Sequence, residues 1–405
     1  MKIAYVNMQF PVPSETFAVL DVKALEAEGH QVSMYCMRPA HPQFTSLRSE
    51  RGVEGIATEH LSLVNALRGF WFGLCHPRML ATLLHWTIAC GASPRHLAKT
   101  LLLLPSALFI FARLFRTRPD VVHLFWGHYP SMVGHLVGRF MPDTVLSSFL
   151  GAHDLVYEYP GSRRLTPRLD TFFTHARSNL ASLLERGFAV LPEVVHRGID
   201  TAIAVEPDEN KFTRLDAPLF VSAGRLIPDK GFEDAIGIFA AIHRERPKAR
   251  LLIMGDGPLK AQLQGISKSY GLGEAVEFLG HVPQQVLIEY LASAHVFLFM
   301  SRYASERLPN AVKEAMFQAC VCIVAPSSGM DELVADGRTG FIVQDQPQAI
   351  SRLRALLRDQ DVCAGIAQQA RMSIFNEFNV RSSMGRYTLA WQEALDRKAS
   401  RVEQE

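Results

Sequence analysis

Two clusters of charged residues and glycines in the second half of the chain follow apolar runs that should form strands. The first, at residues 224–231 (GRLIPDKG), holds Arg225 and Lys230. Glycine permits a tight turn where a strand ends. An arginine with a lysine on such a loop suits a diphosphate, because the guanidinium binds as a planar fork and the ammonium as a point charge. Taken alone, the segment is equally typical of a solvated loop.

The second cluster, at residues 306–315 (ERLPNAVKEA), combines two glutamates with a helix start. The Pro-Asn pair is typical of a first helical turn, which places Glu306 on the entry loop and Glu314 about one turn inside the helix. Amides at a helix start favour anionic or hydroxyl-rich ligands, and carboxylates accept hydrogen bonds from sugar hydroxyls. Two glutamates on a surface helix are common, but both clusters follow strands of one expected sheet and are predicted to line one cleft.

A further glycine segment, residues 255–258 (GDGP), resembles the start of a dinucleotide-binding fingerprint. Lys260 stands where the third glycine of that fingerprint would be. The segment also lacks a convincing acidic residue at the end of a following strand. We therefore predict a strand-to-helix turn at the cleft and no site for NAD.

Short β-branched runs alternate with helical patterns along nearly the whole chain, which predicts parallel sheets covered by helices on both faces. The expected strands are residues 3–8, 32–37, 120–126, 144–150, 189–198, 218–224, 250–255, 276–280, 295–300, 321–326 and 340–343. In 405 residues, of which 48% are hydrophobic, the two sets predict two doubly wound domains. The polar, aperiodic stretch 198–218 marks their boundary.

The charge balance and the cysteines exclude several classes of protein. A net charge of +2 gives no general attraction to nucleic acid. Six cysteines without a C-x-x-C pair are typical of a reducing compartment and of a protein without a zinc framework. The N-terminus lacks the regions of a signal peptide, and no apolar run reaches the roughly 20 residues that span a bilayer. We therefore expect a cytoplasmic protein without a transmembrane helix.

Residues 59–115 are helical in pattern and carry Phe70, Trp71, Phe72 and Trp86 beside several basic side chains. The simpler prediction is a set of helices that face the core of the first domain. The alternative is a basic and aromatic face that rests on a membrane surface. The first half of the chain holds 19 Lys and Arg against 15 Asp and Glu, a mild surplus that favours such contact.

Taken in order, these segments resemble a known enzyme family. The pattern E-x-L-P-N-x-x-x-E-A at residues 306–315 occurs together with GRLIPDKG, GDGP, FLGHV at 278–282 and SGMDELVADGRTGF at 328–341. This series is similar to the retaining glycosyltransferases of family 4. Residues 10–17 (FPVPSETF) and 118–123 (RPDVVH) resemble the subset that builds bacterial exopolysaccharide and lipopolysaccharide.

The resemblance implies an α/β protein with the GT-B fold, in which two facing Rossmann-like, doubly wound domains enclose an inter-domain cleft. The N-terminal domain, residues 1–200, would bind the acceptor. The C-terminal domain, residues 201–378, would bind the nucleotide sugar. A C-terminal helix, residues 379–405, would return to the N-terminal domain.

The resemblance also assigns roles to the charged residues. Arg225 and Lys230 would hold the donor diphosphate, Glu306 would face the donor sugar, and Glu314 would bind the nucleotide ribose. The first three of these, with His153, form the expected catalytic set. The expected donor-binding set is Gly224, Arg225, Lys230, Gly255, Gly280, His281, Val282, Glu306, Leu308, Asn310, Ala311, Glu314 and Glu332.

In the first half, histidines follow two of the expected strands. His153 and Asp154 come after residues 144–150, in a region where the family commonly has a histidine near the donor sugar. His153 is the preferred candidate, with Asp154 orienting it or binding the acceptor, and His128 is the alternative. A single histidine among 15 is more often structural. The expected acceptor-binding set includes the capped start of the first helix and comprises Ser14, Glu15, Thr16, His128 and Asp154, although a capped helix also needs no function.

The implied activity is transfer of a hexosyl group, with retention of configuration, from a nucleotide-diphosphate sugar to a glycan or lipid-linked acceptor. The expected setting is cell-surface polysaccharide biosynthesis, with peripheral contact to the inner face of the membrane. The alternatives are a nucleotide-sugar 2-epimerase and a non-catalytic nucleotide-binding scaffold. Arg307 stands where the family usually has glycine, which affects the prediction of the sugar.

No metal and no cofactor beyond the nucleotide sugar is expected. Asp359 and Asp361 have the D-x-D spacing of metal-dependent transferases of another fold, but they lie between two helical patterns, where we expect a helix cap. The cations Arg225 and Lys230 would neutralise the leaving diphosphate, which is the task of a divalent ion elsewhere.

Overall fold

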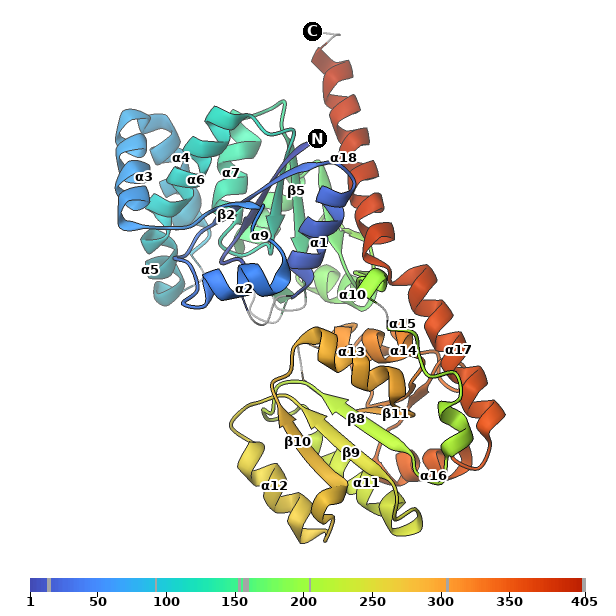
Figure 1. Cartoon of the computed structure of the whole chain (residues 1–405). Coiled ribbons are helices and arrows are strands. Elements are labelled where there is room, and N and C mark those ends of the chain that lie inside the picture. The colour runs from blue at the N-terminus through green and yellow to red at the C-terminus, as the bar shows by residue number, and fades with distance from the viewer. Residues whose placement is uncertain are drawn as a thin grey trace. The chain divides into compact units, whose positions relative to one another are not determined.

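The computed structural model describes residues 1–12, 16–91, 93–151, 154–155, 160–203, 205–303 and 306–402. The chain forms two compact units (Figure 1). Unit 1 consists of Met1–Arg197 together with Val380–Glu405, and unit 2 consists of Gly198–Asn379. The chain therefore enters unit 2 after residue 197 and returns to unit 1 after residue 379.

Among the described residues, unit 1 contains a seven-stranded sheet in the order β3-β2-β1-β4-β5-β6-β7, in which every pair of neighbours is parallel. Its strands are β1 (Lys2–Asn7), β2 (Gln31–Cys36), β3 (Ala57–Glu59), β4 (Val121–Phe125), β5 (Val145–Leu150), β6 (Thr171–Thr174) and β7 (Glu193–Val194). Its helices are α1 (Thr16–Ala27), α2 (Phe44–Arg51), α3 (Leu63–Cys75), α4 (Pro77–Ala89), α5 (Pro94–Leu102), α6 (Leu104–Thr117), α7 (Ser131–Phe140), α9 (Pro160–Leu165), α10 (Ser178–Glu185) and α18 (Val380–Val402).

Successive side chains of β1 point to opposite faces of the sheet, so the core of unit 1 has two layers. Ile3 and Tyr5 face a cluster that contains α1 and α18, whereas Ala4 and Val6 face a cluster that contains α4, α6 and α7. In the first layer, the ring N–H of Trp391 in α18 donates a hydrogen bond to Ser147 Oγ at 2.9 Å. Both faces of the sheet are thus covered, as the apolar strands require.

Unit 2 contains a six-stranded parallel sheet, within the described residues, in the order β10-β9-β8-β11-β12-β13. Its strands are β8 (Leu219–Ala223), β9 (Arg250–Met254), β10 (Val276–Gly280), β11 (Val296–Phe299), β12 (Val321–Val324) and β13 (Phe341–Ile342). Its helices are α11 (Phe232–Glu245), α12 (Lys260–Ser269), α13 (Gln284–Ser293), α14 (Asn310–Phe317), α15 (Met330–Leu333), α16 (Gln346–Leu356) and α17 (Gln360–Glu377).

Both sheets reverse their strand order once, between β1 and β4 in unit 1 and between β8 and β11 in unit 2. Ligands of open α/β sheets bind beyond the carboxyl ends of the strands at such a point. The predicted α/β class and the two Rossmann-like sheets are confirmed. Two short strands, β3 and β6, were not predicted, and the run at 189–198 forms only the two-residue strand β7.

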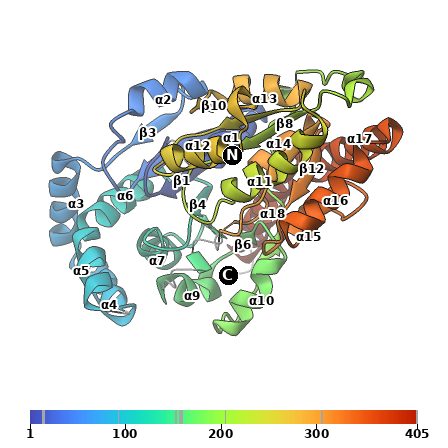
Figure 2. The ribbon, with the colours of Figure 1, turned by 90° about the horizontal axis from the view of Figure 1, so that it is seen from below.

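The prediction that residues 59–115 face the core holds for α6 but is wrong for α3. Most of α6 is buried against the sheet, whereas large apolar side chains of α3 are exposed. Both views place α6 between α3 and the sheet (Figures 1 and 2). No single helix among the described residues is long and apolar enough to cross a membrane, and α5 with α6 reaches that length and hydropathy only as a pair bent by 44°.

Candidate functional site

The loop after β8 is held against the end of β11 by a glycine. Gly231 has φ +71° and caps α11, and a Cβ at this position would lie 2.0 Å from the carbonyl oxygen of Met300. Any larger residue would combine a left-handed backbone with this clash. The loop that carries Lys230 is therefore fixed beside the residues that follow β11.

Lys230 and Glu306 form an ion pair at the reversal point of the unit 2 sheet. The Lys230 and Glu306 side chains are only 12% and 14% exposed, so solvent screens the pair weakly. Ser301 Oγ donates to the same Glu306 oxygen at 3.1 Å, and Lys230 Nζ lies 5.3 Å from the centroid of the Tyr303 ring. The structure thus brings together two of the predicted residues and adds two that the sequence did not single out.

Arg225 lies on the same loop, but its side chain is exposed. The two predicted cations therefore differ in setting: Lys230 is part of a partly buried cluster, whereas Arg225 remains at the surface. The expectation that both grip one diphosphate stays a prediction.

Glu314 lies in the second turn of α14 and is almost completely buried. Gln284, the first residue of α13, donates a hydrogen bond from Nε2 to Glu314 Oε1 at 2.7 Å. Burial raises the pKa of Glu314 from 4.5 to about 7, although the Gln284 hydrogen bond and the Lys313 charge partly oppose the shift. The sequence did not single out Gln284, although this polar residue follows the end of β10 closely.

The start of α14 offers backbone donors beside this glutamate. Pro309 occupies the N-cap position, where proline has no side-chain oxygen to accept from the first amides. Leu308 precedes it at φ +46° with a buried side chain, an unfavourable backbone for leucine. The predicted donors at Asn310 and Ala311 belong to this first turn, whose N–H groups have no acceptor within the helix.

Glycines at the ends of β8, β9 and β10 let these backbone segments pack against one another. Gly255 N donates to Gly280 O at 2.7 Å, and a Cβ at Gly255 would lie 1.8 Å from the carbonyl oxygen of Gly224. The strand-to-helix turn predicted at residues 255–258 is therefore packed directly against the Arg225 loop. His281 is exposed and Val282 is half-buried.

Glu332 belongs to α15 and is half-buried. Burial lowers the pKa of Arg307, and the charges of Glu306 and Glu332 oppose that shift. Arg307 Nη1 also donates to the carbonyl oxygen of Glu306 at 2.8 Å. The residue that departs from the family pattern is thus part of the cluster.

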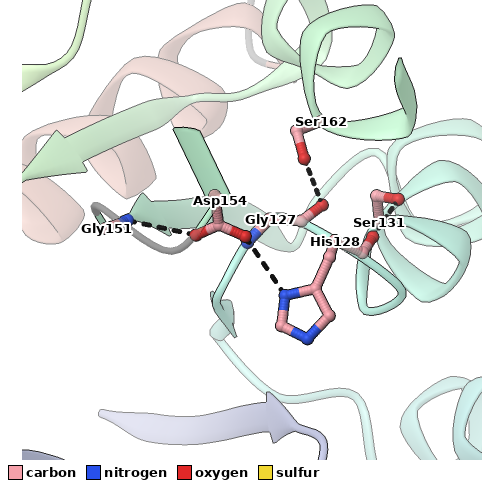
Figure 3. Close-up of polar contacts among 6 residues, drawn as sticks. All are labelled: Gly127, His128, Ser131, Gly151, Asp154 and Ser162. Carbon is pink, nitrogen blue, oxygen red and sulfur yellow. Dashed lines mark hydrogen bonds and ion pairs between the residues drawn. The ribbon is translucent and has the colours of Figure 1, made fainter. Parts of the chain in front are cut away.

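In unit 1, a buried aspartate holds a histidine after β4 (Figure 3). His128 Nδ1 lies 3.1 Å from Asp154 Oδ1, and these side chains are 9% and 1% exposed. Asp154 also accepts from the backbone N–H groups of Gly127 and Gly151, each at 3.1 Å. The other ring nitrogen of His128 points away from Asp154 (Figure 3). The carboxylate thus positions His128, the alternative candidate.

Three sequence-predicted residues, His153, Ser14 and Glu15, lie outside the described residues. Thr16 is the first residue of α1 and is half-buried. The proposed orientation of His153 by Asp154 therefore stays a prediction, whereas the contact of Asp154 with His128 is present.

Residues 206–373 match the family model described as "Glycosyl transferases group 1". The chain carries a group 1 glycosyltransferase domain. WcaL of Salmonella typhimurium, a putative colanic acid biosynthesis glycosyltransferase, is 24% identical over 407 residues, which cover 94% of this chain and 96% of the relative. LpsE of Rhizobium meliloti, a lipopolysaccharide core biosynthesis glycosyltransferase, is 24% identical over 265 residues, which cover 62% of this chain and 76% of the relative.

Among solved structures, HepE of Anabaena in complex with UDP and glucose has a TM-score of 0.68 at 16% identity, and the alignment covers 97% of this chain and 99% of HepE. This likeness shows the fold, which is that of the GT-B glycosyltransferases, as predicted. Lys230, Glu306 and Glu314 all lie within the glycosyltransferase domain.

The D-x-D segment of this glycosyltransferase domain is structural. Asp359 caps α17 and accepts from the backbone N–H groups of Asp361 and Val362 at 3.0 and 3.1 Å. The predicted helix cap is confirmed. Within the described ranges, no group of three or more His, Cys, Asp or Glu side chains could hold a metal ion.

Proposed function

We propose that this protein is a retaining glycosyltransferase that moves a hexosyl group from a nucleotide-diphosphate sugar to a glycan or lipid-linked acceptor in cell-surface polysaccharide biosynthesis. The observation that carries the proposal is the partly buried Lys230–Glu306–Ser301 cluster at the reversal point of the unit 2 sheet. The names of WcaL and LpsE support the biosynthetic setting, and the UDP and glucose bound by HepE support the class of donor.

The Lys230–Glu306 pair suits a diphosphate next to a sugar. A diphosphate bound at the sheet end attracts the Lys230 ammonium more strongly than one carboxylate does, because it carries more negative charge. When Lys230 turns to the phosphates, Glu306 becomes able to accept hydrogen bonds from sugar hydroxyls, with Ser301 still fixing its position. Binding of the phosphates by Lys230 is thereby coupled to recognition of the sugar by Glu306.

The Glu314–Gln284 pair suits the ribose of the donor. Two vicinal hydroxyls can donate to one carboxylate, and hydrogen bonds to the charged form lower the pKa of a buried acid. Because burial raises the pKa of Glu314 to about 7, ribose binding at or below neutral pH is expected to release a proton. Unit 2 is therefore the proposed donor-binding domain and unit 1 the proposed acceptor-binding domain.

The proposed reaction breaks the bond between the anomeric carbon and the diphosphate and forms a bond from that carbon to an acceptor hydroxyl on the same face. The proton of the hydroxyl leaves with the departing phosphate. Lys230, with Arg225, is proposed to offset the charge that develops on the diphosphate without a metal ion. His128, held by Asp154, is proposed to contact the reacting sugar through its second ring nitrogen. Retention rests on the motif resemblance.

A donor screen tests the proposal. Thermal shift with UDP-, GDP- and ADP-sugars should show stabilisation by one of the donor classes, because a ligand that binds only the folded state raises the melting temperature. Lys230→Ala should weaken binding of that donor by about 10- to 100-fold, the value of a charge-assisted contact. The matched control is Lys248→Ala, since Lys248 forms an exposed pair with Asp216 in the same unit.

The alternatives give different products. A 2-epimerase would convert the donor alone into a second nucleotide sugar, whereas a transferase without acceptor should give at most slow hydrolysis. A scaffold would bind the donor and turn over neither substrate. Incubation of the stabilising donor with and without lipid-linked oligosaccharide, followed by separation of nucleotide sugars, distinguishes the three.

A further inference from the structure

Helix α3 presents its large apolar side chains to solvent and its glycines to the protein. Six apolar residues, each between 51% and 78% exposed, recur at the spacing of one helix face: Leu63, Val64, Leu67, Phe70, Trp71 and Leu74. We call these six the α3 face. A surface helix of a soluble protein normally has the opposite polarity, with its apolar side towards the core.

The glycines explain this orientation. A Cβ at Gly69 would lie 2.0 Å from the carbonyl oxygen of Pro105, and a Cβ at Gly73 would lie 2.9 Å from Leu108 Cδ1, so α3 packs closely on α6 through its smallest residues. Gly69 and Gly73 are one turn apart and leave the bulky residues on the far side of the helix. The exposure of the α3 face therefore follows from the packing of α3 on α6.

The chain segment that carries the α3 face is basic, although Arg113 within it forms an ion pair with Glu59, which directly precedes it. Residues 60–119 contain seven Lys and Arg and no Asp or Glu, although the whole chain has 42 of the former and 40 of the latter. Arg68, Arg78, Arg95 and Lys99 in this segment are exposed. An apolar face with cationic surroundings is complementary to a bilayer that carries anionic headgroups.

We propose that the α3 face docks unit 1 on an anionic lipid bilayer, with α3 lying in the plane of the interface. Its 13 residues span about 20 Å, too short to cross the roughly 30 Å of hydrocarbon. Trp71 and Phe70 enter the headgroup boundary, and the arginines and Lys99 contact lipid phosphates. A second copy of the chain is a poorer occupant, because a symmetric dimer through the α3 face would bring two copies of the same basic segment together.

This inference gives the proposed membrane contact a defined surface, and its test measures lipid binding and not sugar transfer, so the two proposals can fail separately. Vesicles of phosphatidylcholine with 30% phosphatidylglycerol should float the full chain, and phosphatidylcholine alone should bind it at least about tenfold more weakly. Binding to the anionic vesicles should weaken by about tenfold when high salt screens the headgroups.

Substitutions locate the contact. Phe70→Ser and Trp71→Ser should each reduce partitioning by about tenfold, and the double variant by about 100-fold, because each removes a large apolar side chain from the interface. The matched controls are Met372→Ser and Phe375→Ser in α17, which are similarly exposed in unit 2 and should leave partitioning unchanged. Because the substituted side chains are exposed, all five variants should keep the melting temperature of the native chain.

Tryptophan fluorescence gives a second measurement on the native chain. Of the four tryptophans, Trp71 is 68% exposed, Trp126 is half-buried, and Trp86 and Trp391 are buried, so anionic vesicles should shift the emission of Trp71 to the blue. Trp71→Phe should still float with the vesicles but lose most of that shift. The proposal is overturned if the native chain ignores anionic vesicles, if the α17 controls lose as much binding as the α3 variants, or if the α3 substitutions change only the oligomeric state in sedimentation.

Discussion

The strongest test of the proposed donor site is Glu314→Gln, which should stabilise the protein and weaken donor binding. Glu314 is buried, and its pKa is raised from 4.5 to about 7 mainly by that burial. A folded-state pKa above the unfolded value means that the native state binds the proton more tightly, so stability falls as pH rises from about 4.5 to about 7 and is level above. Glutamine keeps the shape and the acceptor for Gln284 without the charge.

The size of the expected change in stability follows from the size of the Glu314 pKa shift. The rise of the Glu314 pKa from 4.5 to about 7 corresponds to about 3 kcal/mol, most of which the native protein loses between pH 5 and pH 8. In a domain of this size, each kcal/mol changes the melting temperature by about 2–4 °C. We therefore expect Glu314→Gln to raise the melting temperature of unit 2 by roughly 6–12 °C more at pH 8 than at pH 5.

Calorimetry at the two pH values, with donor titrations in parallel, is the assay. Glu289→Gln on the exposed side of α13 is the control and should shift the melting temperature by about 1 °C or less at either pH. Donor binding to Glu314→Gln should weaken by about tenfold or more, because a ribose hydroxyl loses a charged acceptor. Equal melting shifts at pH 5 and pH 8, or tighter donor binding, would refute the reasoning.

Three further predictions concern the clusters around the two sheet ends. Asp154→Asn should lower kcat by about tenfold or more while donor affinity measured by titration is unchanged, because the aspartate acts by holding His128; a change in donor affinity alone would contradict this role. Lys230→Gln should weaken the binding of a nucleoside diphosphate far more than the binding of the corresponding nucleoside, which competition binding can measure. Gly231→Ala should destabilise unit 2 by about 2 kcal/mol or more in urea unfolding, since its Cβ meets Met300; an unchanged midpoint would contradict the close approach.

Much of the proposed donor site was predictable from the ends of apolar runs. Lys230 and Glu306 were expected at one sheet edge because parallel strands all present their carboxyl ends on the same side, and the structure pairs them there. Gln284 and Ser301 were missed, since an uncharged polar residue near a strand end has no signal of its own. The partner of such a residue depends on which helices become neighbours. Gln284 in α13 meets Glu314 only because α13 packs beside α14.

Unit 1 shows two limits of such prediction. Asp154 is 26 residues from His128, and only the adjacent ends of β4 and β5 bring them together, so sequence proximity pointed to His153 instead. The periodicity of residues 63–75 predicts a helix with one apolar side but not which side the protein covers. Gly69 and Gly73 decide which side is covered, because these small residues let α3 pack closely on α6, whereas the bulky apolar side could not come as close.

The return of the chain to unit 1 at residue 380 has a consequence for its synthesis. Tyr387 and Trp391 of α18 fill the layer beside Phe173 and Val145, and both rings are fully buried there. While the ribosome is still producing residues 198–379, that layer of the sheet is covered by α1 but not by α18. Unit 1 therefore cannot complete its fold until α18 has been synthesised, which happens after all of unit 2. The glycosyltransferase domain is free to fold before that point.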